Sequence, residues 1–130
     1  MKGFALIVLS LWAMLTSPPS ASGNSPYEVR NRSGVYHGNA DEFSKPVVLE
    51  AARVFDQIPE YQEIKRRHLT KDVPEYGLLL ERANRHFFRA LFKVARRDGY
   101  DLIAETGAVV DRRGTALKDV TDDAIRALEE

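Results

Sequence analysis

The chain has 130 residues and no cysteine, and its 19 basic and 19 acidic side chains balance to a formal net charge of zero. This length allows one small domain, and the lack of cysteine excludes disulfide bonds and a cysteine nucleophile. The charges are unevenly spread, because residues 65–97 carry 10 basic and 3 acidic side chains, whereas residues 98–130 carry 4 and 9. A binding surface is therefore sought in the basic middle of the chain.

The N-terminal residues 1–23 have the order of a secretory signal peptide. Lys2 precedes an almost wholly apolar run from Phe4 to Leu15, and prolines and small residues follow up to Gly23. This run is shorter than the roughly 20 residues that a membrane-spanning helix needs. We therefore expect export and a periplasmic or cell-envelope location, with an uncleaved N-terminal anchor as the alternative.

Residues 24–44 are polar, contain glycine and show no periodicity. A segment of this kind buries too little apolar surface to offset the entropy lost on ordering, so we expect a flexible tail. The folded domain is expected to cover residues 45–130. It begins with the β-branched run Pro46–Leu49, which predicts a strand, and from Ala51 the apolar residues take a helical spacing.

Two further helix starts resemble each other, because each has a proline in the first turn, where a missing N–H costs nothing. They predict a short helix over Pro59–His68 and a long one over Val73–Arg97. Asp72 and Glu75 have the spacing of a capping box for the second helix. The short turn between the helices requires them to run antiparallel, so residues 51–97 form a helical hairpin. Whether Pro59 kinks one helix or separates two stays open.

The long helix has the clearest period in the chain. Its apolar residues alternate four and three apart, as in a coiled-coil seam. These residues are Tyr76, Leu80, Ala83, Phe87, Ala90 and Val94. Phe88, Leu91 and Ala95 are expected to widen this buried face, and Gly99 to end the helix.

Two short strands and a helix complete the predicted α+β fold. The strands are Tyr100–Glu105 and Ala108–Val110, and the helix starts with Thr121 as its N-cap and continues through Leu128. Three short strands make a poor independent sheet. We therefore expect the sheet to be shared between copies of the chain in an oligomer.

This arrangement resembles the Skp/OmpH family of periplasmic chaperones, over nearly all of residues 45–130. The matching segments are Val47–Phe55, Val94–Val110 and Lys118–Leu128. The sharpest part is "YDLIAETGAVV" followed at a short distance by "DVTDDAIRAL". The resemblance implies a homotrimer whose shared β body carries helical arms around a cavity for unfolded outer-membrane proteins. The arms of this chain are much shorter than those of the best-known members, so the cavity would be shallow.

Basic residues at helical spacing form a stripe along the long helix. The stripe consists of Arg82, Arg85, Arg89, Lys93 and Arg96, and a basic tip of Lys65, Arg66, Arg67, His68 and Lys71 lies at the turn of the hairpin. Both suit unfolded or acidic envelope proteins, or an anionic lipid surface. The alternative is a solvated helix face. Because export is expected, nucleic acid is not an expected partner.

The aromatic residues of the hairpin are expected in the core, except Phe92, which departs from the seam and is a candidate contact between subunits. The histidines match no metal spacing, and no nucleophile motif or phosphate-binding loop is present in the sequence. We expect no catalysis, metal or cofactor. The sequence thus favours ATP-independent binding of unfolded envelope proteins. A structural or adaptor oligomer without chaperone activity is the alternative.

Overall fold

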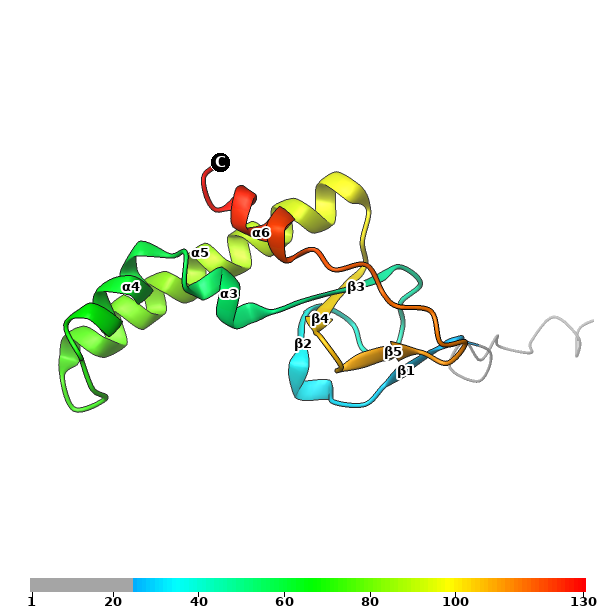
Figure 1. Ribbon diagram of the computed structural model, residues 1–130, viewed down its shortest axis with the longest axis horizontal. Helices are drawn as coiled ribbons and strands as arrows, with labels where there is room; N and C mark the ends of the chain where they lie inside the picture. Colours follow the sequence, from blue (N-terminus) through cyan, green and yellow to red (C-terminus); the bar gives the residue numbers. More distant parts are fainter. Residues whose placement is uncertain (1–24) are drawn as a thin grey trace, which may run out of the picture.

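The computed structural model describes residues 25–130, and the expected signal peptide, residues 1–23, lies outside them. The elements are β1 (Tyr27–Val29), a 3-10 turn η1 (Arg32–Gly34), β2 (Val35–Gly38), β3 (Pro46–Leu49), α3 (Ala51–Phe55), α4 (Pro59–Arg66), α5 (Pro74–Asp98), β4 (Leu102–Glu105), β5 (Val109–Asp111) and α6 (Thr121–Ala127). The helices gather at one end of the molecule and the strands at the other, and α4 with α5 projects away from the strands (Figure 1). The predicted α+β class is confirmed.

Strand β4 is the centre of a three-stranded sheet with the order β2-β4-β3. β3 runs parallel to β4, with Val47 opposite Ile103, whereas β2 runs antiparallel and places His37 opposite the same residue. A parallel pair needs a long crossover connection, which α3, α4 and α5 provide. β1 and β5 form a separate antiparallel pair.

The segment expected to be a flexible tail is ordered, so that expectation is wrong. Residues 27–38 supply β1 and β2, which pair with β5 and β4 from the other end of the chain. Contacts with residues distant in the sequence hold this segment in place. The Asp101 carboxylate accepts hydrogen bonds from the backbone N–H groups of Ser44 and Lys45, each at 2.7 Å. Gly38 has φ +96°, and a Cβ there would lie 2.1 Å from the Asp101 carbonyl oxygen.

This pairing removes one reason to expect an oligomer. The sequence predicts three strands without a complete sheet, but β1 and β2 complete two sheets within a single chain. The need to borrow strands from other copies is therefore no longer a reason for assembly. A trimer stays a prediction that depends on the resemblance alone.

The hairpin consists of separate helices on either side of Pro59. α3 ends at Phe55, and α4 begins at Pro59 with Ile58 as its N-cap, so Pro59 separates two helices and does not kink one. α4 ends at Arg66, earlier than expected, because His68 adopts φ 52° and the Leu69 N–H donates to the Ile64 carbonyl at 3.0 Å. This is a Schellman motif with histidine in the left-handed position.

Two predicted helix caps are wrong, and one helix end is confirmed. Val73 is the N-cap of α5 and makes no side-chain cap, so Asp72 and Glu75 form no capping box. At α6, Val120 is the N-cap and Thr121 is the first helical residue, whose N–H donates to the Asp119 carboxylate at 2.8 Å. Gly99, with φ 76°, ends α5 as predicted.

The core forms around Phe87, which is 1 % exposed. Its ring stacks on Phe55 of α3 at 4.6 Å between centroids and meets the edge of Tyr36 from β2 at 5.4 Å. The predicted seam is confirmed at its centre but shifted at its start, where Leu79 is buried and Leu80 only partly so. The core therefore joins the hairpin to the strand that the N-terminal segment adds.

Glu105 links three elements at the junction of sheet and hairpin. Its Oε1 accepts a hydrogen bond from the Tyr36 hydroxyl at 2.7 Å and another from the N–H of Ala51 at 3.1 Å. Glu105 thus ties β2 and the start of α3 to the end of β4. Burial and the adjacent carboxylate raise the pKa of Tyr36 to about 12.

Candidate functional site

The side of α5 opposite the core is the most distinctive surface of the described residues. α5 has 25 residues and, at about 1.5 Å per residue, is roughly 37 Å long. We define its outer face by the exposed residues on this side. They are Leu78, Glu81, Arg82, Arg85, Phe88, Arg89, Phe92 and Arg96.

Four of the five predicted stripe residues lie on this outer face. Arg85 donates to Glu81 at 3.1 Å, whereas Arg82 and Arg89 have no ion-pair partner within residues 25–130. Lys93 departs from the stripe, because its ammonium group donates to the backbone carbonyl of Glu130 beyond the end of α6. The outer face is therefore an arginine surface, and Lys93 instead holds the C-terminus against α5.

Large apolar side chains interrupt the arginines. Leu78, Phe88 and Phe92 are 49 %, 48 % and 51 % exposed, and they are the exposed large hydrophobic residues of the described part of the chain. The Arg96 guanidinium lies 5.6 Å from the centroid of the Phe92 ring, within cation–π range. Arginine and aromatic groups thus form one mixed surface.

The sequence predicts only part of this apolar surface. Phe88 is expected in the core, but its side chain points about 100° away from that of the preceding residue, Phe87, and this angle carries it out of the buried face. Phe88 meets only the edge of Phe87, at 5.2 Å between ring centroids. Leu78 was not predicted to belong to this surface, although its spacing from Arg82 and Arg85 places it on the same side of the helix. Phe92 is exposed, and its subunit contact stays a prediction.

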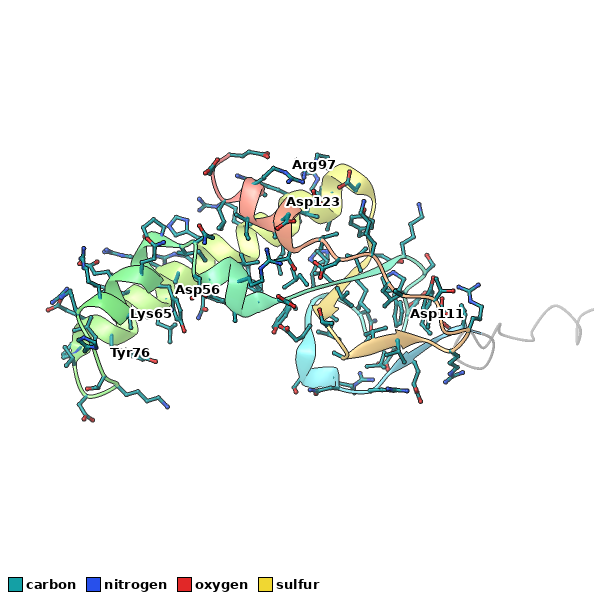
Figure 2. The ribbon with its side chains drawn as sticks, viewed as in Figure 1. Asp56, Lys65, Tyr76, Arg97, Asp111 and Asp123 are labelled. Atoms are coloured by element: carbon teal, nitrogen blue, oxygen red, sulfur yellow. The ribbon has the colours of Figure 1, made fainter. Side chains whose placement is uncertain are left out.

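The predicted basic tip is largely paired with acidic side chains. Lys65 turns back to Asp56 at 2.9 Å (Figure 2), and Arg67 bonds Glu75 at 2.8 Å. These hydrogen bonds raise the pKa of Lys65 and lower that of Glu75. Arg66 lies 3.8 Å from Glu63, which also pairs with Arg67 at 3.4 Å. The tip therefore joins the two helices of the hairpin, although exposed pairs of this kind add little stability.

The remaining residues of the predicted tip are Lys71 and His68. Lys71 is exposed, and His68 occupies the left-handed position after α4. Figure 2 places Tyr76 at this outer end of the hairpin and Asp111 at the opposite end of the molecule. The unpaired positive charge of the hairpin is thus found along the outer face of α5 more than at its tip.

The histidines and acidic residues are arranged for structural contacts. His86 on α5 lies 3.1 Å from Glu60 on α4, so it bridges the hairpin. Among residues 25–130, no group of three or more histidine, aspartate or glutamate side chains has the arrangement of a metal site. Within the same range, no helix has the length and apolar character to span a bilayer.

Comparison with known proteins adds no relative of this chain. No family model matches it, and neither a curated protein nor a solved structure matches it. The outer face of α5 and the resemblance seen in the sequence are therefore the observations that bear on function.

Proposed function

We propose that the protein binds unfolded or partly folded envelope proteins without ATP, through the outer face of α5. The observation that carries this proposal is that the exposed Leu78, Phe88 and Phe92 lie among four arginines on one helix. Unfolded chains present both apolar segments and acidic groups. Arginine attracts the acidic groups over a distance, and the half-exposed rings offer apolar contact once a client has arrived.

Binding on such a surface is reversible and involves no chemical step. The outer face lies along a helix and leaves a client free to change its contacts, which suits a partner without a fixed shape. Salt should weaken capture, since the attraction acts between solvent-exposed charges. A periplasmic location and a homotrimer belong to the same proposal, and the resemblance to the Skp/OmpH family supports both.

The test is suppression of aggregation when a urea-unfolded outer-membrane barrel protein is diluted into buffer with the exported protein. The double variant Arg85→Glu with Arg89→Glu should suppress aggregation less and lose most of the salt dependence. The matched control, Arg66→Glu with Lys71→Glu, changes the net charge equally at the tip and should behave as wild type. Equal activity of wild type and the outer-face variant would remove this surface from the proposal. A wild type that never suppresses aggregation would favour the adaptor alternative.

A further inference from the structure

The outer face of α5 contains a second heptad seam. Its residues are Leu78, Arg82, Arg85, Arg89, Phe92 and Arg96, which we call the outer seam. The spacing alternates four and three, the period by which one helix packs along another. At about 100° per residue this seam lies opposite the buried one, which includes Ala83, Phe87 and Val94.

The outer seam is free along its length in the described chain. All six residues are exposed, and they extend over roughly 27 Å at about 1.5 Å per residue. The neighbour of Phe92 on the sheet side is His37, whose ring centroid lies 6.3 Å away. A partner helix can therefore lie along the seam without moving any element of the fold.

The charge of the seam selects its occupant. A second copy packed on the same surface would oppose arginines with arginines, and like charges across a helix seam are unfavourable. A bilayer surface fits less well, because three arginines separate Leu78 from Phe92 and no continuous apolar band faces outward. A partner helix with carboxylates opposite the arginines fits both the positive charge of the seam and its separated apolar residues. Guanidinium and carboxylate groups pair in a bidentate geometry.

We propose that the outer seam docks an acidic amphipathic helix of a partner protein. The partner places apolar side chains opposite Leu78 and Phe92, and glutamate or aspartate opposite Arg82, Arg85, Arg89 and Arg96. This site shares its surface with the proposed capture of unfolded proteins, but it recognises a folded helix in a defined register. Each of the two activities can therefore exist without the other.

The probe is a synthetic helical peptide of about 21 residues, three heptads. It carries leucine opposite Leu78 and Phe92 and glutamate opposite the four arginines. An isomer of identical composition, with these residues moved off the seam, is the control peptide. Fluorescence anisotropy with the exported protein should show the matched peptide binding about tenfold tighter than the isomer, a difference of about 1.4 kcal/mol. High salt should reduce the difference.

Charge exchange tests the register. The variant Arg85→Glu with Arg89→Glu should lose about tenfold in affinity for the matched peptide, or about 1.4 kcal/mol. A peptide with lysine at the two facing positions should restore it. The tip variant Arg66→Glu with Lys71→Glu should bind the matched peptide as wild type, and circular dichroism checks that both variants are folded.

Equal binding of the two isomers, or no restoration by the lysine peptide, would overturn the helix seam. Binding to vesicles of anionic phospholipid without discrimination between the peptides would also overturn it and assign the surface to lipid. If the protein suppresses client aggregation but binds the two isomers equally, helix docking on the outer seam is refuted and the proposed function stands. If the protein discriminates between the two peptides but does not suppress client aggregation, the proposed function is refuted and helix docking on the outer seam stands.

Discussion

Replacing Tyr36 by phenylalanine tests how the N-terminal strand is attached to the domain. The substitution keeps the ring against Phe87 and removes the hydroxyl that donates to Glu105 at 2.7 Å. A hydrogen bond to a charged acceptor contributes roughly 1.5–3 kcal/mol. Glu105 keeps its bond from the Ala51 N–H, so we expect Tyr36→Phe to lower the free energy of unfolding near neutral pH by about 1–2 kcal/mol.

The pH dependence of the same variant gives a second readout. The pKa of Tyr36 is about 12 in the folded chain, against 10.0 for an unperturbed tyrosine. The folded state therefore keeps the phenolic proton where the unfolded state has lost it, and the stabilising contribution is complete below pH 10 and lost as the pH rises toward 12. Two pKa units correspond to nearly 3 kcal/mol, and solvent screening reduces this to about 1–2 kcal/mol.

Urea unfolding followed by circular dichroism measures both effects. Wild type should lose stability in alkali faster than Tyr36→Phe, and the two curves should converge above the unperturbed tyrosine pKa. Tyr76→Phe is a matched control, because the Tyr76 hydroxyl has no hydrogen-bond partner in the described part of the chain. Stability curves of wild type and Tyr36→Phe that stay parallel through the alkaline range would refute the link between Tyr36 and Glu105.

Three further outcomes are expected. His68→Gly should raise the free energy of unfolding by about 1 kcal/mol, because glycine adopts the left-handed conformation without strain, and an unchanged urea midpoint would contradict this. The N–H bonds from Ser44 and Lys45 outweigh the partial burial of Asp101 and hold its pKa below 3.8, so wild type should lose this stabilisation as the pH falls below that value, whereas Asp101→Asn should not. Light scattering of the purified protein should give the mass of a trimer, and a monomer would contradict the assembly drawn from the resemblance.

Three departures from the predicted structure have one cause, which is contact between different elements. Residues 24–44 show no period of their own, and their strands form only because β4 and β5, far along the chain, present partners. The pairing of the tip follows from the turn that brings Arg67 of α4 beside Glu75 of α5. No local spacing encodes such contacts. The missing capping box has the same origin, because Glu75 faces Arg67 and not the start of its own helix.

The candidate site was predictable to the extent that it lies on one regular helix. Spacing alone predicted that Arg82, Arg85, Arg89 and Arg96 share a face, since a helix turns by about 100° at each residue. Lys93 has the same spacing but is drawn to the carbonyl of Glu130, which only the packing of α6 on α5 brings near. The exposure of Phe88 likewise depends on which side of α5 the sheet and α6 leave uncovered.

The sequence by itself determined the helices, their proline starts, the stop at Gly99 and the basic face of α5, because each follows from the conformational preferences and spacing of neighbouring residues. The tertiary structure alone decided that residues 27–38 complete the sheets and that Glu105 joins β2 and β4 to α3. It also decided that most of the tip is paired, whereas of the arginines on the outer face only Arg85 has an ion-pair partner among the described residues. These depend on residues distant in the chain meeting in space, where hydrogen bonds, ion pairs and burial are set by the packing partner.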